Sequence, residues 1–260
     1  MKALLISDIQ GDPGNLSHIK DIGKKLEISC IFCAGDLNNW NKKIPEISQY
    51  SEIHKYLKSI GNNLFLVDGN HDNTDLMKHV FGKDYTETRN ADNFLALAHN
   101  NMHHGDLKTF IKQQKDHTNF HEFYTKKINS SIDYFLEKSR EYPKIDIFMT
   151  HVPPYTEHTE KTATGNSILN LVSDKEEICY LTGKTIRLLE KTNPLLFLSG
   201  HRTNAFFGRY RGTYFISAGT FSDKKNDTGS FMMLDINFEK RHIDCELYRI
   251  DRELEEVYKL

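Results

Sequence analysis

Five short segments of this chain carry side chains that bind metals or transfer protons, and each follows an apolar run. They occupy residues 7–10, 35–38, 69–72, 150–154 and 200–203 and read Ser-Asp-Ile-Gln, Gly-Asp-Leu-Asn, Gly-Asn-His-Asp, Thr-His-Val-Pro-Pro and Gly-His-Arg-Thr. Carboxylates, amide oxygens and imidazoles are ligands of divalent metals. An imidazole beside a carboxylate can also act as a general acid or base. The ordered set indicates a metal-dependent catalytic site.

The first seventy residues alternate between strand and helix patterns, which places the first three segments at strand ends. The expected elements, in order, are strand Ala3–Ile6, helix Leu16–Leu26, strand Ile28–Ala34, helix Ile44–Ile60 and strand Leu64–Val67. Continuous apolar runs are typical of strands covered on both faces, and this alternation predicts parallel pairing with right-handed crossovers. Ligands collect beyond the carboxyl ends of such strands. Asp8, Asp36 and Asn70 are therefore expected to meet.

The segment between residues 83 and 142 has a different pattern. A strand is expected at Phe94–Ala98, and helices at Leu107–Gln114 and Phe120–Glu137. The last helix has a single apolar stripe formed by Phe120, Phe123, Tyr124, Ile128, Ile132, Phe135 and Leu136. Packing against one surface would account for that stripe, and the alternative is an insertion that covers the site.

Strand patterns return after residue 144. They lie at Ile145–Met149, Leu195–Leu198, Phe206–Tyr210, Tyr214–Ser217, Phe231–Ile236 and Ile243–Tyr248. Between the first two of these strands, Pro153–Asp174 is a long polar stretch directly after His151. Loops of that length usually have a function or are disordered, so this one is expected to shape the pocket.

Composition excludes several classes of protein. The 260 residues include 34 Lys and Arg against 36 Asp and Glu, so net charge gives no support to nucleic-acid binding, although a local basic groove would not show in the total. The apolar run at the N-terminus has about five residues, too few for a secretory signal or a membrane span. A cytoplasmic protein without a membrane segment is expected. Cys30 and Cys33 lie three apart on a predicted strand, so they should face opposite sides and belong to the core.

The five segments resemble the signature of the calcineurin-like metallophosphoesterases, with two departures. The family usually has histidine where this chain has Gln10, and a second histidine where it has Thr203. The resemblance implies an α/β fold, a four-layer αββα sandwich in which two mixed sheets are flanked by helices. We expect a single domain over residues 1–260, with a helical insertion at about residues 100–142.

The resemblance also implies roles for individual residues. One metal would be held by Asp36, Asn70, His151 and His201, and this mixed nitrogen and oxygen set suits Mn, Fe, Zn, Co or Ni. The aspartate that matches Asp36 bridges to a second metal in the family. His71 would contact the phosphoryl group and protonate the leaving oxygen, and Asp72 would orient its ring. Asn70 and His71 would both contact the substrate.

The other metal would be bound by Asp8, Gln10, Asp36 and Thr203, and here the donors are weak. A glutamine offers only an amide oxygen, and a threonine only a hydroxyl. Three outcomes stay open: a weak site of the Mn or Mg type, an enzyme with one metal, or a site completed by another residue. The candidates for completion are Asp12, Asn38, Asn204, His99, His103 and His104. Arg202 could instead place a guanidinium there and bind phosphate.

The resemblance implies metal-dependent hydrolysis of a phosphodiester or phosphomonoester by a metal-activated hydroxide, with one or two ions per chain. A small phosphoester substrate is expected, and neither the substrate nor the oligomeric state can be read from the sequence. The alternative is a non-catalytic scaffold that binds a protein partner, as the metallophosphoesterase-like retromer subunit does. Retention of His71, Asn70, His151 and His201 favours the enzyme. The chain has neither a P-loop nor a Gly-x-Ser-x-Gly elbow.

Overall fold

The first sheet of the computed structural model is built on the N-terminal parallel strands. The structure describes residues 1–11, 13–38, 46–91, 94–100, 120–156, 167–169, 178–221, 229–250 and 257–259. The strand order in this sheet is β15 (Val257–Lys259), β14 (His242–Ile250), β13 (Gly229–Asn237), β1 (Lys2–Ile6), β2 (Cys30–Cys33) and β3 (Asn63–Leu66). The last three strands are parallel, whereas β13 runs antiparallel to β1. The predicted parallel opening is confirmed.

A second mixed sheet faces the first. Its order is β11 (Phe206–Tyr210), β12 (Thr213–Ser217), β10 (Leu196–Ser199), β6 (Ile147–Thr150), β5 (Phe94–His99) and β4 (Thr88–Ala91). The four strands from β12 to β5 are parallel, and the edge strands β11 and β4 are antiparallel to their neighbours. A small sheet beside it has the order β7 (Tyr155–Thr156), β9 (Ile178–Leu181) and β8 (Ser167–Leu169).

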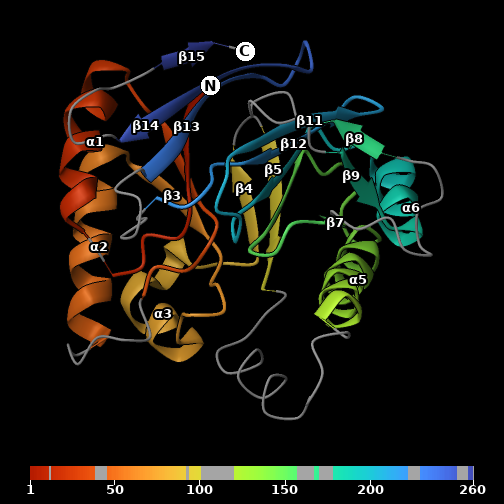
Figure 1. Cartoon of the computed structure of the whole chain (residues 1–260), viewed down its shortest axis with the longest axis horizontal. Helices are drawn as coiled ribbons and strands as arrows, with labels where there is room; N and C mark the ends of the chain where they lie inside the picture. Colours follow the sequence, from red (N-terminus) through yellow and green to blue (C-terminus); the bar gives the residue numbers. More distant parts are fainter. Residues whose placement is uncertain are drawn as a thin grey trace.

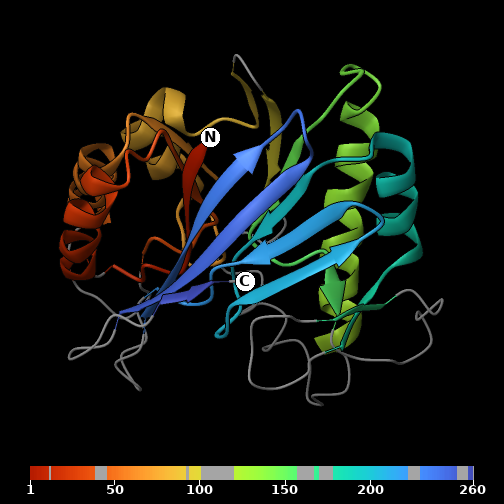
Figure 2. The same ribbon diagram turned by 90° about the horizontal axis from the view of Figure 1, so that it is seen from above.

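Helices cover the outer faces of both sheets, so the molecule has the four layers expected from the sequence (Figures 1 and 2). The first sheet carries α1 (Gly14–Lys25), α2 (Glu46–Ile60) and α3 (Thr74–Phe81), which runs into a 3₁₀ turn, η1 (Gly82–Asp84). The second sheet carries α5 (Phe120–Lys138) and α6 (Gly183–Thr192). In the part of the chain that the structure describes, no helix is long and apolar enough to cross a membrane.

Three apolar clusters fill the spaces between the layers. One lies between the two sheets and includes Cys30 and Phe32, and another lies between the first sheet and its helices and includes Cys33. The two cysteines therefore face opposite sides of β2, as their spacing predicts, and both are buried free thiols. The third cluster joins the second sheet to α5 and α6. Burial of each large side chain there contributes about 1.5–3 kcal/mol.

Helix α5 packs on the second sheet, which agrees with the packing interpretation of its apolar stripe. Ile128, Ile132 and Phe135 are buried in the same cluster as Phe148 of β6 and Phe197 of β10. The helix lies between β5 and β6 in the chain, and because those strands are parallel it runs back across the sheet. Its N-terminal turn is thus at the carboxyl ends of the strands. The predicted insertion stays a prediction, and the helix expected at Leu107–Gln114 lies outside the described residues.

Some elements were not predicted. Helix α3 begins at an Asn73 cap whose side chain accepts hydrogen bonds from the backbone N–H groups of Asp75 and Leu76, and α6 begins at a Thr182 cap. Each is short, with 8 and 10 residues, so only two or three turns carry the apolar pattern. The stretch 153–174 was expected to be one loop. In its described parts it contains β7 and β8, which pair with β9.

Candidate metal centre

The loops that follow the strands are joined to one another by backbone hydrogen bonds. The N–H of Asp8 donates to the carbonyl of Gly35 at 2.9 Å, and the N–H of Gln10 donates to the carbonyl of Asp36 at 3.0 Å. On the second sheet, the N–H of Gly200 donates to the carbonyl of His151 at 2.9 Å. These bonds bring the ends of neighbouring strands into register at one edge.

Glycine at the start of three segments allows the loops to approach closely. Gly35 has a φ of 90°, a conformation that side chains with a Cβ rarely adopt. A Cβ on Gly69 would collide with the carboxylate and the backbone nitrogen of Asp36, and one on Gly200 would lie 2.6 Å from the carbonyl oxygen of Ala34. Steric constraints therefore account for the glycine at the start of each of these segments.

Four residues of the predicted site have left-handed backbones. The φ values are 56° for Asp8, 52° for Gln10, 55° for Asp36 and 63° for His201. Such conformations cost about 1–3 kcal/mol each for residues other than glycine and gather at functional sites. Here they turn the chain sharply after each strand and direct side chains across the sheet edge.

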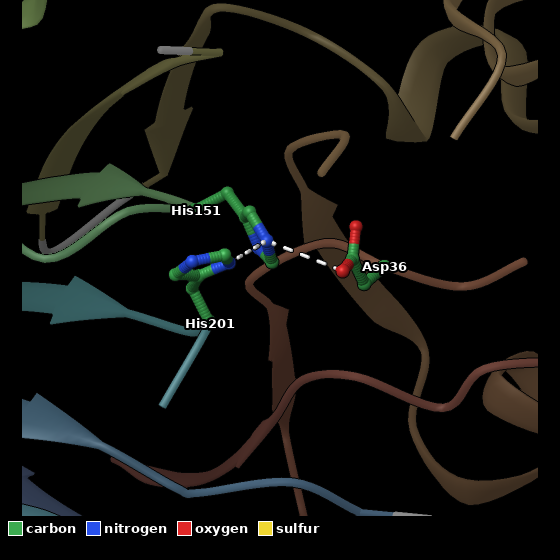
Figure 3. A group of neighbouring side chains, drawn as sticks. All are labelled: Asp36, His151 and His201. Carbon is green, nitrogen blue, oxygen red and sulfur yellow. Dashed lines mark hydrogen bonds and ion pairs between the residues drawn. The ribbon is translucent and has the colours of Figure 1, made fainter. Parts of the chain in front are cut away.

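One carboxylate and two imidazoles converge on a single point (Figure 3). Asp36 Oδ2 lies 3.4 Å from His151 Nε2, which in turn lies 3.2 Å from His201 Nδ1. Among the described His, Cys, Asp and Glu residues, these three form the one group whose ligand atoms all lie within 4.8 Å of one another. Asn70 Oδ1 is 3.0 Å from the same His151 Nε2. We call Asp36, Asn70, His151 and His201 the complete half of the site.

The hydrogen bonds of His151 fix which of its nitrogens faces this point. Its Nδ1 donates to the carbonyl of Ala34 at 2.7 Å, so Nε2 is the atom left for a ligand. The side chain has no exposed surface. Burial opposes its charge, but the charge and hydrogen bond of Asp36 outweigh burial and raise its pKa to about 10.

The pKa values of Asp36 and His201 are lowered, whereas that of His151 is raised. Burial would raise the pKa of Asp36, but His151 and His71 outweigh it and lower that pKa. Burial and the neighbouring charge of His151 lower the pKa of His201 to about 3, so its ring is neutral. A buried proton is thus held between Asp36 and His151 beside a neutral imidazole. A divalent cation can take the place of such a proton, because metal binding releases protons from its ligands. The residues fit a metal.

His71 lies beside the complete half and, unlike His151, reaches solvent. Its backbone N–H donates to Asp36 Oδ1 at 2.8 Å, and its Nε2 lies 3.6 Å from Asp36 Oδ2. The side chain is 26% exposed. The role of His71 as a general acid stays a prediction.

Asp72 is hydrogen-bonded to the loops that carry Asp36 and Asn70. Its carboxylate accepts hydrogen bonds from the N–H groups of Leu37, Asn38 and Gly69 at 2.9, 3.0 and 2.9 Å, and from the hydroxyl of Tyr50 at 3.1 Å. Three of these bonds end on Oδ1 and one on Oδ2. Burial and the charge of Asp36 raise its pKa to about 7, against the effect of these backbone donors. The described contacts make Asp72 the anchor of the Asp36 and Asn70 loops. Orientation of His71 by Asp72 stays a prediction.

We call Asp8, Gln10 and Thr203 the depleted half. Asp8 is buried, and its Oδ2 accepts a hydrogen bond from the N–H of His201 at 3.0 Å. Burial raises its pKa to about 7; His151 lowers it and Asp36 raises it further. Gln10 is half-buried and Thr203 is exposed. This half contains a buried carboxylate with weak donors beside it.

Of the residues that could complete the depleted half, His99 is directed elsewhere. His99 Nδ1 is 3.1 Å from Ser131 Oγ, and its ring stacks on Tyr134 at 4.2 Å, so it faces α5. Asn204 is exposed, and Asn38 is buried with its backbone N–H bound to Asp72. The other three candidates, Asp12, His103 and His104, lie outside the described residues.

Arg202 is directed toward the small sheet. Its guanidinium carbon lies 5.6 Å from the ring centre of Tyr155 and 5.3 Å from that of Phe206, and its Nη1 is 3.9 Å from Cys179 Sγ. The residue is 9% exposed. Substrate binding by Arg202 stays a prediction.

Tyr124 is a neighbour of the site that the sequence did not indicate. Its hydroxyl oxygen lies 3.2 Å from His201 Nε2. The sequence placed Tyr124 on the packing stripe of α5, and spacing gives no sign that the first residues of the stripe reach beyond the sheet edge.

A family model described as calcineurin-like phosphoesterase matches residues 1–203. The chain belongs to this family. Its members depend on divalent metals, and together with the cluster of Asp36, His151 and His201 this supports metal-dependent phosphoester hydrolysis in general terms. No curated protein matches the chain significantly.

Solved structures with TM-scores of 0.50 or more show the same fold at low sequence identity. The protein TT1561 of Thermus thermophilus has a TM-score of 0.55 and 12% identity, over 94% of this chain and 97% of that one. A candidate 5′-nucleotidase of Staphylococcus aureus, solved with α-ketoglutarate, has a TM-score of 0.50 and 13% identity, over 99% of this chain and 54% of that one. Zinc-bound Vps29 of Entamoeba histolytica has a TM-score of 0.49 and 13% identity, over 100% of this chain and 98% of that one.

Proposed function

We propose that this phosphoesterase hydrolyses a small phosphodiester or phosphomonoester with one strong metal centre, formed by the complete half, and a weak or absent second one. The observation that supports this most directly is the convergence of Asp36 Oδ2, His151 Nε2 and His201 Nδ1, with Asn70 Oδ1 beside them. The depleted half offers Asp8 with a glutamine and an exposed threonine.

The donor set suits Mn, Fe, Zn, Co or Ni. A divalent ion held there would polarise a phosphoryl oxygen and lower the pKa of a water molecule. The protein residues supply the charge and the orientation of the ligands. Asp36 contributes the buried negative charge that holds the cation, and Ala34 fixes the ring of His151.

We assign proton transfer to His71. Its ring lies beside Asp36 and is partly exposed, so it can reach both a bound phosphoryl group and bulk solvent. The protonated imidazole is the form that donates to a leaving oxygen. Asn70, next to it in the chain, would assist by holding the same group.

The scaffold alternative has less support from the site. A partner-binding surface needs neither a buried carboxylate and imidazole pair nor a partly exposed histidine beside it. Both are present here.

The test is an assay of the Mn²⁺-loaded protein on bis(p-nitrophenyl) phosphate and p-nitrophenyl phosphate. Wild type should hydrolyse at least one of them. His71→Ala should lower kcat about 10²–10⁴-fold, the usual contribution of general acid catalysis, without change in metal content. His242→Ala, on the exposed surface of β14, is the matched control and should leave the rate unchanged. Equal inertness of wild type and His71→Ala with several metals would support the scaffold instead.

A further inference from the structure

Tyr124 reaches the candidate metal centre from α5, in the helical layer that covers the second sheet. It shares one face of α5 with Ile128 and Ile132, four and eight residues later, and those two are buried against the second sheet. Because α5 runs back across that sheet from the carboxyl ends of the strands, the first residue of this row stands over the loop that carries His201. The ring centres of Tyr124 and His201 are 5.5 Å apart.

Each nitrogen of the His201 ring has its own neighbour. Nδ1 lies 3.2 Å from His151 Nε2, inside the ligand cluster, and Nε2 lies 3.2 Å from the hydroxyl oxygen of Tyr124. A neutral imidazole has one N–H and one lone pair. If Nδ1 gives its lone pair to a metal, the proton is on Nε2 and is donated to Tyr124.

We propose that Tyr124 is a positioning residue that selects Nδ1 of His201 as the metal-binding nitrogen. This inference rests on the proposed metal centre. Tyr124 acts by accepting the Nε2–H of His201, which fixes the ring orientation and the tautomer together. The atom that accepts from a ligating histidine typically affects metal affinity 10–100-fold. Without the hydroxyl, a turn of the ring about its Cβ–Cγ bond would no longer be opposed by a hydrogen bond.

The chain offers a matched control on the same helix. Tyr134 also belongs to α5, and its hydroxyl donates to Glu87 Oε2 at 2.6 Å, on the strand β4 side. Tyr124→Phe and Tyr134→Phe each remove one phenol oxygen and one hydrogen bond from one helix. Only the first removes a partner of a candidate ligand.

The experiment measures Zn²⁺ dissociation constants by calorimetry and thermal unfolding of the metal-free proteins. Tyr124→Phe should weaken Zn²⁺ binding 10–100-fold, and Tyr134→Phe should leave it within twofold of wild type. Unchanged affinity in Tyr124→Phe would overturn the role of Tyr124 alone. A wild type that fails to bind Zn²⁺ would overturn the metal centre itself, and with it this inference.

A second readout does not depend on the folding of Tyr124→Phe. Long-range ¹⁵N–¹H spectra of the Zn²⁺-bound wild type, with His201 assigned by comparison with His201→Ala, report which ring nitrogen bears the proton. We expect a proton on Nε2 and zinc on Nδ1. Zinc on Nε2 would refute the assignment. If Tyr124→Phe folds, its His201 signals should show a mixture of the two ring orientations.

Discussion

The complete and depleted halves are both built from loops at the carboxyl ends of the strands, but they differ in how many ligand atoms they bring together. In the complete half, Asp36, His151 and His201 bring their ligand atoms within 4.8 Å, and the ring of His151 is anchored to a backbone carbonyl. In the depleted half, Asp8 is buried but bonded to the N–H of His201, and Thr203 faces solvent. Shared loops and left-handed turns therefore do not by themselves make a ligand set. The side-chain chemistry at two positions separates the halves.

The most direct way to break this contrast is to remove one residue from each half. His151→Ala should abolish stoichiometric metal binding and lower the hydrolysis rate about 10³-fold or more, because the charge stabilisation supplied by a metal is worth several kcal/mol. Gln10→Ala should change the rate about threefold at most, since an amide oxygen is a weak donor. Metal content by plasma mass spectrometry and kcat/KM on one aryl phosphoester measure both.

Equal losses in the two variants would show that Gln10 holds a catalytic ion and that the halves are equivalent. The stability of His151→Ala needs separate measurement, because the carbonyl of Ala34 loses its donor. An unsatisfied buried acceptor costs about 1–3 kcal/mol.

Introducing the two missing histidines tests the same difference by adding ligands to the depleted half. Gln10→His with Thr203→His gives the depleted half the imidazoles that the family usually has. Gln10 has a φ of 52°, a region that histidine tolerates better than most residues. We expect the number of Mn²⁺ ions per chain to rise from about one toward two, and the rate to rise about tenfold through a second charge on the phosphoryl group.

Calorimetric titration gives the stoichiometry of the restored variant. Each single variant serves as a control, because one imidazole beside Asp8 should bind more weakly than two. A wild type that already binds two ions tightly would contradict the one-strong-site proposal.

A third prediction concerns the buried charge of the depleted half in the absence of metal. Burial raises the pKa of Asp8 to about 7, although His151 acts in the opposite direction. The folded chain then holds this proton to higher pH than the unfolded chain, so the contribution of Asp8 to the unfolding free energy falls as pH rises from about 4 to 7. Asp8→Asn removes the titration while keeping an oxygen for the N–H of His201.

The unfolding free energy of Asp8→Asn relative to wild type should therefore rise by about 1–3 kcal/mol between pH 5 and pH 8. Urea denaturation in the presence of a chelator measures it. Asp244→Asn, at an exposed carboxylate of β14, is the control. A difference that is independent of pH would mean that Asp8 is already ionised at pH 5.

The sequence predicted the central strands of both large sheets and the order of the site segments because both depend on local patterns, whereas the short strands β4, β7, β8, β9 and β15 were missed. Continuous apolar runs located β1, β2 and β3, and Asp36 and Asn70 follow their ends. Side-chain direction is different, since it depends on contacts between distant segments. Asp72 anchors loops, Arg202 faces aromatic rings, and Tyr124 reaches His201 across 77 positions. The spacing of residues within one segment cannot predict contacts between residues that lie so far apart in the sequence. The single domain and the insertion remain predictions.

Substitution of Arg202 has the smallest expected effect. It distinguishes the substrate-binding role predicted from the sequence from the packing role that its aromatic contacts indicate. Its guanidinium lies over Tyr155 and Phe206, so Arg202→Met keeps the apolar stem and loses mainly cation–π attraction of about 0.5–2 kcal/mol. We expect KM for an aryl phosphoester to stay within twofold of wild type, with a small fall in unfolding free energy. Arg209→Met, at an exposed arginine of β11 stacked on Tyr214, is a matched loss of the same kind of contact. A tenfold rise in KM with unchanged stability would instead place the Arg202 guanidinium on the phosphate, and the depleted half would then owe its charge to an arginine in place of a metal.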